Sequence, residues 1–191
     1  MMYLLAGLIV FLGAHSISIV APAWRDGMAA RLGEQKWKAI IGLVSIAGFV
    51  LLVWGYGQAR LDPIVLYVPP TWLRHLALLL MVPVFPLLLA AFLPGRIKTA
   101  ARHPMLAAVK LWALAHLLAN GMAADVLLFG AFLAWAVVDR ISLGRRPLRP
   151  VRGAPPSRLN DATVIVAGLA LYVVFVGWAH LWLIGVVPIA H

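Results

Sequence analysis

The sequence predicts an all-α integral membrane protein, a polytopic bundle of about six transmembrane helices. Of its 191 residues, 64% are hydrophobic and only 12% are charged, whereas a soluble domain is about half apolar and about a quarter charged. The apolar residues form runs close to the roughly 20 residues that a helix needs to cross a bilayer. The charged residues gather in short clusters between those runs, as expected of connections at a membrane surface.

Six segments have the length and composition of a transmembrane helix. We expect a kink in the third, because Pro83 and Pro86 interrupt it. The fourth has Pro104 in its first turn and Gly121 just past its end, as is typical of helix boundaries. With no internal repeat and no separate soluble segment, residues 1–191 are expected to form a single transmembrane domain. The predicted helices are 1–20, 39–58, 72–93, 104–121, 122–141 and 162–187.

The basic residues predict the orientation. Cytoplasmic connections of membrane proteins carry an excess of Lys and Arg, so the odd-numbered connections are predicted to be cytoplasmic and both termini periplasmic, in a bacterial inner (cytoplasmic) membrane. The first helix lacks a basic region before it and a small-residue cleavage site after it, so we expect a mature helix rather than a signal peptide. The odd-numbered connections contain Arg25, Arg31, Lys36, Lys38, Arg96, Lys98, Arg102, Arg140, Arg145, Arg146, Arg149, Arg152 and Arg158.

The clustering of the basic residues between the apolar runs also indicates which molecules the chain binds. A net charge of +10 is typical of nucleic-acid-binding proteins, but charges confined to membrane connections argue against a nucleic-acid partner. We expect contacts with membrane lipid instead, because basic segments beside a bilayer attract anionic headgroups.

Three of the six histidines, His15, His116 and His180, lie deeper within the predicted membrane helices than the others. Ionisable groups there are costly and usually face the bundle interior with a partner. One interpretation is a helix–helix hydrogen bond to a hydroxyl or carbonyl. The other is a metal or haem site, because imidazole is a common ligand of both. The chain has no cysteine and few intramembrane carboxylates, so it offers few ligands for a zinc ion. A b-type haem needs only one or two imidazoles and an apolar cleft.

Helix geometry narrows the choice of histidines. His116 follows His103 by 13 residues, about 20 Å along one helix, so the two cannot share one iron. His103 and His75 are expected at the membrane interface, and His191 in solvent. His15 lies about 14 Å in from the cytoplasmic side, judged from Trp24, within about one helical turn of the depth of His116. His15 and His116 are therefore the predicted metal ligands, with His180 as an alternative partner for His116.

Several motifs resemble the signature of the NnrU family. On a helical wheel Trp112, His116 and Asn120 share one face of the fourth helix. The resemblance spans residues 15 to about 140, most of the membrane core. Asp139-Arg140, at the cytoplasmic end of the fifth helix, is also predicted to be an interfacial ion pair. The matching residues are Arg102-His103-Pro104, Trp112, Ala115-His116 and Asn120-Gly121, with further matches at His15-Ser16, Gly33-Glu34 and Asp139-Arg140.

The NnrU family is similar to the plant and cyanobacterial 15-cis-zeta-carotene isomerases, which are haem b membrane enzymes whose iron changes ligation with redox state. The resemblance implies a haem b with His15 and His116 as axial ligands. The isomerases have a cysteine one turn before the second histidine, where this chain has Ala113, so it lacks that sulfur for a ligand switch. NnrU proteins are associated with denitrification, through nitrite and nitric oxide reduction. The other motif residues expected at the cofactor are Arg102, His103, Trp112 and Asn120.

These observations leave different classes of function open. The first is a haem-dependent isomerase-like enzyme or redox protein that acts on a lipid-soluble small molecule. The second is a non-catalytic accessory or assembly factor for a respiratory nitrogen-oxide reductase, which needs no cofactor. A transporter ranks last, because the membrane segments carry few charges and show no repeated pair of broken helices.

Overall fold

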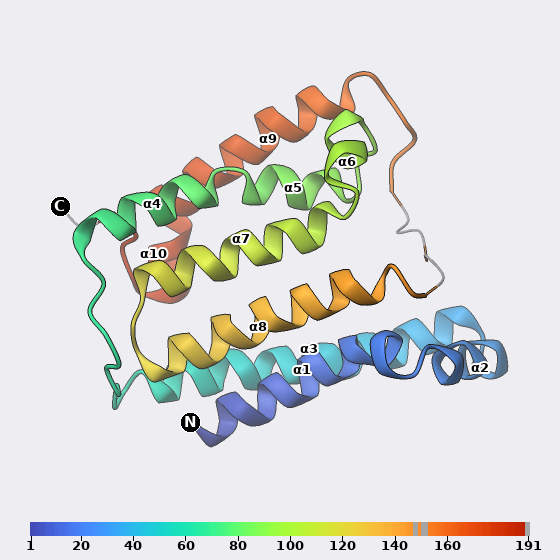
Figure 1. The fold of residues 1–191 in the computed structure, drawn as a ribbon, viewed down its shortest axis with the longest axis horizontal. Coiled ribbons are helices and arrows are strands. Elements are labelled where there is room, and N and C mark those ends of the chain that lie inside the picture. The colour runs from blue at the N-terminus through green and yellow to red at the C-terminus, as the bar shows by residue number, and fades with distance from the viewer. Residues whose placement is uncertain (147–148, 150–152, 190–191) are drawn as a thin grey trace. The chain divides into compact units, whose positions relative to one another are not determined.

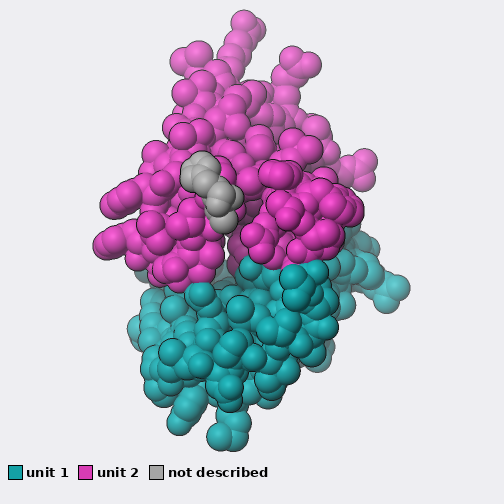
Figure 2. Space-filling model, turned by 90° about the vertical axis from the view of Figure 1, so that its left-hand side faces the viewer, with its two compact units in different colours: residues 1–68, 120–147 teal, residues 69–119, 148–191 magenta. Residues whose placement is uncertain are grey.

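The structure, a computed structural model, describes residues 1–146, 149 and 153–189, and its named elements are all helical (Figure 1). The chain divides into two compact units, coloured separately in Figure 2. Unit 1 comprises Met1–Val68 and Asn120–Pro147, and unit 2 comprises Pro69–Ala119 and Leu148–His191. The predicted connection from Arg145 to Arg158 is described only in part, since Pro147, Pro150 and Arg152, like His191, lie outside the described residues.

The membrane character of the fold is confirmed. Four described helices are long and apolar enough to cross a bilayer, and they expose large apolar side chains such as Ile9, Leu43 and Val166. The helix over 104–119 is apolar but shorter, and the helix over 123–142 carries three charged residues. A total of six spans and the periplasmic termini therefore stay predictions. The four candidate spans are Met2–Val20, Glu34–Ala59, Thr71–Ala90 and Asn160–Ile184.

Unit 1 contains α1 (Met2–Val20), α2 (Pro22–Leu32), α3 (Glu34–Ala59) and α8 (Ala123–Ser142). Helix α1 packs along α3 and also against α8, and α2 packs against α3. Small residues allow α1 and α3 to approach closely, as is typical of membrane helix pairs. A Cβ atom added at Gly7, Gly48 or Gly55 would overlap the backbone of the opposite helix.

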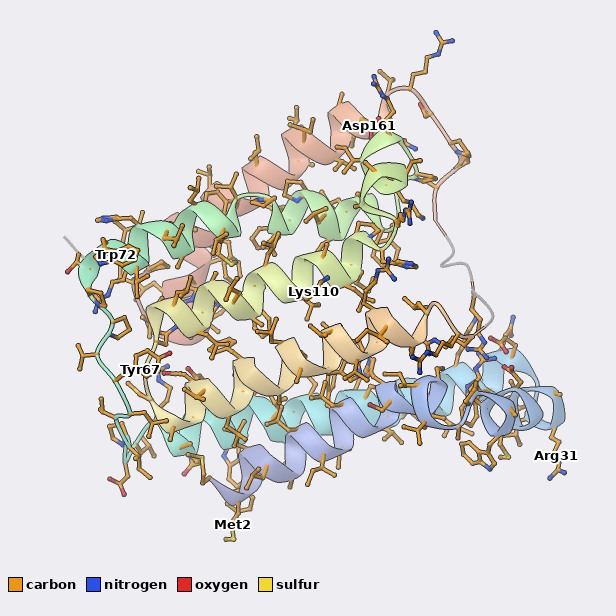
Figure 3. The ribbon with its side chains drawn as sticks, in the orientation of Figure 1. Met2, Arg31, Tyr67, Trp72, Lys110 and Asp161 are labelled. Carbon is orange, nitrogen blue, oxygen red and sulfur yellow. The ribbon has the colours of Figure 1, made fainter. Side chains whose placement is uncertain are left out.

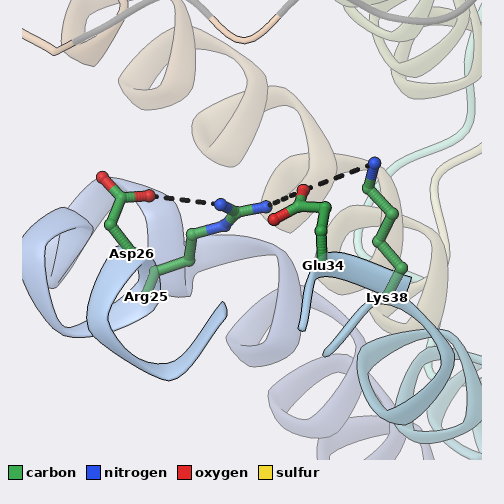
Figure 4. A network of polar contacts seen from close by, with 4 residues as sticks. All are labelled: Arg25, Asp26, Glu34 and Lys38. Carbon is green, nitrogen blue, oxygen red and sulfur yellow. Dashed lines mark hydrogen bonds and ion pairs between the residues drawn. The ribbon is translucent and has the colours of Figure 1, made fainter. Parts of the chain in front are cut away.

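Helix α2 was not predicted, and α3 begins at Glu34 rather than near residue 39. Pro22 lies in the first turn of α2, where its missing N–H costs nothing. Gly33 then separates α2 from α3 with a φ of +84°, a conformation that favours glycine. Arg25 pairs with Glu34 at 2.7 Å and with Asp26 at 3.1 Å. These contacts (Figure 4), above all the hydrogen bond to Glu34, raise the pKa of the Arg25 guanidinium. Three of the charged residues that predicted a loop thus pair with one another, and the Arg25–Glu34 pair joins α2 to α3.

Unit 2 is organised around a short helix, α5 (Val84–Ala90), which packs against α7 (Pro104–Ala119) and α9 (Asn160–Val174). Helix α4 (Thr71–Met81) packs against α7 and is separated from α5 at Val82–Pro83. The break that Pro83 and Pro86 predict in this segment is therefore present. The remaining elements are α6 (Arg96–Ala101), the π-helix η1 (Phe175–Ala179) and α10 (His180–Ile184).

A connection of unit 1 pairs two segments that are distant in the sequence. The N–H groups of Leu66 and Tyr67 both donate to the Gly121 carbonyl, at 2.8 and 3.2 Å, and Val65 forms an isolated β-bridge with Met122. A Cβ atom at Gly121 would overlap the Tyr67 carbonyl oxygen, so this close approach requires glycine. Burial and the charge of Asp125 raise the pKa of the Tyr67 hydroxyl.

Candidate functional site

His15 lies on an exposed side of α1, in unit 1. Its Nδ1 is 2.8 Å from the carbonyl oxygen of Phe11, one turn earlier. A carbonyl oxygen only accepts hydrogen bonds, so Nδ1 must carry the proton. In the neutral ring this leaves a lone pair on Nε2, the atom through which an imidazole with this arrangement binds a metal.

Aromatic side chains from α1 and α8 lie beside the His15 ring. Phe11 is 4.4 Å away between ring centroids, and Trp135 presents an edge at 6.0 Å. Phe132 in turn lies 5.6 Å from Phe11. The Trp135 Nε1 atom is buried without a hydrogen-bond acceptor among the described residues. The sequence analysis did not select Phe132 and Trp135, although their i, i+3 spacing on one helix places them on the same face.

His116 lies in the last turn of α7, in unit 2. Its Nδ1 donates to the carbonyl oxygen of Trp112 at 2.8 Å, and the two rings lie 5.3 Å apart at an angle of 53°. His116 therefore makes the same bond, four residues back, as His15 makes in unit 1. The shared face of α7 does not continue to Asn120, because α7 ends at Ala119. Asn120 belongs to unit 1, where its carbonyl accepts a hydrogen bond from Tyr67, labelled in Figure 3.

The Arg102-His103-Pro104 motif forms the turn between α6 and α7. Arg102 has a φ of +57°, a strained conformation for a residue with a Cβ atom. Its N–H donates to the Lys98 carbonyl at 2.9 Å, and that of His103 donates to the Ala101 carbonyl at 2.6 Å. Pro104 then starts α7. The turn lies the length of α7 away from His116, roughly 20 Å along the helix, so these motif residues form a separate cluster.

His180 is the third intramembrane histidine, and it directly follows the π-helix η1. Its Nδ1 donates to the Val186 carbonyl at 2.7 Å, and its ring meets the edge of Phe175 at 5.7 Å. Short π-helical segments occur frequently at functional sites. No residue in the sequence of η1 marks this change of helix type, so the prediction of a continuous helix over 162–187 missed it.

The donor set fits a haem better than a bare metal ion. Within the described residues, no group of three or more His, Cys, Asp or Glu side chains could hold a metal ion. A haem iron needs only one or two axial imidazoles. Metal-bound histidines typically donate the other ring N–H to a carbonyl or carboxylate, and both His15 and His116 have this bond.

The structure places the predicted residues at four separate positions. His15 lies in unit 1 with its aromatic neighbours, and Asn120 lies in the same unit at the connection to Tyr67. In unit 2, Trp112 lies beside His116, whereas Arg102 and His103 are at the other end of α7. The joint ligation of one iron by His15 and His116 stays a prediction.

Asp139 has a different partner from the predicted one. Its carboxylate forms an ion pair with Arg146, not with the adjacent Arg140. Successive residues on a helix point in directions about 100° apart, so Arg140 cannot easily reach the same side. Arg146 lies in the turn after α8 and reaches back to Asp139, with a bond from Ser142 to the same carboxylate at 3.4 Å.

Comparison with known proteins gives one match. The family model described as NnrU protein matches residues 3–188, nearly the whole chain. No curated protein and no solved structure matches the chain.

Proposed function

Because the chain belongs to the NnrU family, we propose that it is a haem b protein of the bacterial inner membrane with His15 and His116 as axial ligands. The observation that carries this proposal is the bond that each ring donates from Nδ1 to the carbonyl four residues earlier. This bond fixes the neutral tautomer and the ring orientation, and it makes Nε2 a better ligand.

The side chains around the two rings support the same role. Phe11 and Trp135 lie beside the His15 ring, and Trp112 lies against His116. A b-type haem needs apolar side chains of this kind beside its ligands. A b-type haem bound here would supply one-electron chemistry at its iron.

The proposed substrate or redox partner is a lipid-soluble small molecule, within nitrite and nitric oxide respiration. Exposed apolar side chains cover the candidate membrane helices, so a molecule dissolved in the bilayer would reach the protein without crossing a polar surface. A thiolate ligand is not part of this proposal, because the chain has no cysteine and the fully buried Ala113 stands one turn before His116.

Haem content and spectrum of histidine variants test the axial assignment. We expect His15→Ala and His116→Ala each to lose most of the haem, or to convert a six-coordinate spectrum to a five-coordinate one. His116→Met should retain haem with a raised reduction potential, because a thioether ligand stabilises ferrous iron. The measurement is the haem-to-protein ratio with the absorption spectrum of the detergent-purified chain.

His75→Ala is the matched control, since His75 is exposed on α4, and it should keep full haem content. His180→Ala tests the alternative ligand. A His116→Ala variant with unchanged haem and spectrum would exclude the axial role. A colourless wild-type protein that co-purifies with a nitrogen-oxide reductase would instead favour the accessory-factor function.

A further inference from the structure

A cavity of about 410 Å³ opens in unit 1 where the end of α1, the start of α2 and the end of α8 meet. Its apolar wall consists of Ile19, Pro22, Val138 and Ile141. This volume lies within the roughly 300–1,000 Å³ typical of small-molecule sites. None of these residues belongs to the proposed haem site, so the cavity is a separate feature.

The polar end of the cavity carries two guanidinium groups, from Arg145 and Arg146. The Arg146 side chain is only 11% exposed and is ion-paired with Asp139. Its Nε atom is buried and has no hydrogen-bond acceptor among the described residues. A buried N–H without an acceptor is costly, so a ligand oxygen at this position would be stabilised.

Arg145 adds a second positive charge. Its side chain is exposed at the cavity, and the structure shows no ion pair of its guanidinium within the described part of the chain. The Asp139 carboxylate neutralises only one of the two guanidinium groups. The polar end therefore keeps a net positive charge, and Ser142 adds a hydroxyl there. Arginine binds phosphate oxygens through paired N–H donors, which makes these groups suited to a phosphate.

We propose that this cavity binds an anionic phospholipid, with its phosphate at Arg145 and Arg146 and its acyl chain against Ile19, Val138 and Ile141. A free phosphate ion would contact only the polar end of the cavity, whereas a phospholipid contacts both the polar end and the apolar wall. The same basic connection is predicted to face the cytoplasm, where basic pockets between membrane helices bind anionic headgroups. The proposal does not depend on haem binding.

Lipid binding to the full chain in detergent tests the proposal by native mass spectrometry. The probes are phosphatidylglycerol, phosphatidylcholine with the same acyl chains, and inorganic phosphate. We expect phosphatidylglycerol to bind the wild type with at least tenfold higher affinity than phosphatidylcholine. Arg145→Gln should weaken phosphatidylglycerol binding by about tenfold, the effect of losing one charge-assisted hydrogen bond. Ile141→Trp should also weaken it, because the larger ring fills the apolar part.

Arg31→Gln is the matched control. Arg31 is an exposed residue of α2, labelled in Figure 3, that does not line the cavity. It removes the same charge and should leave phosphatidylglycerol affinity unchanged. The proposal is overturned if Arg145→Gln binds as the wild type does, or if Arg31→Gln weakens binding equally. It is also overturned if inorganic phosphate displaces the lipid at equal concentration, or if phosphatidylcholine binds equally well.

Discussion

At the scale of single residues, Asp125 shows how this chain accommodates a carboxylate inside an apolar bundle. The residue is 2% exposed, and a buried carboxylate is costly unless its oxygens accept hydrogen bonds. The Tyr56 hydroxyl donates to one oxygen at 2.6 Å, and the Met122 N–H donates to the other at 3.0 Å. Asp125 therefore caps α8 and joins it to α3.

Removing the tyrosine hydroxyl should destabilise unit 1. Tyr56→Phe leaves one oxygen of Asp125 without its donor, and hydrogen bonds to charged groups contribute about 1.5–3 kcal/mol. We expect a loss of free energy of unfolding of that order, measured by chemical denaturation in detergent. Tyr3→Phe serves as the control, because Tyr3 is exposed and packs on Trp54 through its ring. Equal stability of the two variants would show that the bond to Asp125 contributes nothing.

The sequence could predict which histidines belong to the candidate site, but not which side chains lie beside them. Intramembrane position and motif spacing select His15 and His116. The neighbours of His15 could not be selected, because Trp135 is 120 positions away in the chain and no local pattern links them. The bonds from the histidine rings to their own helices depend on rotamers, which the sequence does not specify.

At the scale of elements, the prolines and the lengths of the apolar runs predicted the positions of most helices. Contacts between residues that are distant in the sequence could not be predicted in this way. Pro104 starts α7 and Pro83 separates α4 from α5, as the sequence predicts. Helix α2 was missed because it has only 11 residues, three of them charged, and the Arg25–Glu34 pair that joins α2 to α3 is not a local signal. The pairing of Tyr67 with Gly121 was missed for the same reason.

Glycine substitutions in α3 test the close packing of α1 on α3. A Cβ atom at Gly48 would meet the backbone nitrogen of Phe11 at 2.7 Å, and backbone cannot move aside easily. We expect Gly48→Ala to destabilise unit 1 by about 1–3 kcal/mol, as overpacking does, with a lower midpoint of thermal unfolding. Gly42→Ala is the control on the same helix, because a Cβ atom there meets nothing within 4 Å. A Gly48→Ala protein as stable as Gly42→Ala would contradict this packing.

At the scale of the whole molecule, the distribution of basic residues predicts a topology that cysteine labelling can test. The chain has no native cysteine, so a single introduced thiol reports one position without background. Asp62 and Arg31 are both exposed, and the predicted orientation places them on opposite sides of the membrane. We expect a membrane-impermeant maleimide to label Asp62→Cys in intact spheroplasts, but Arg31→Cys only after lysis. The reverse pattern would invert the topology, and labelling of both before lysis would exclude it.

The central claim is the proposal that each chain binds one haem b, with His15 and His116 as its axial ligands. Its most direct test is the reduced-minus-oxidised absorption spectrum of the full chain, purified in detergent from cells with ample haem. The account predicts a low-spin b-type spectrum with one haem per chain, as two imidazole ligands produce. A colourless chain, or a spectrum of a five-coordinate haem, would contradict it.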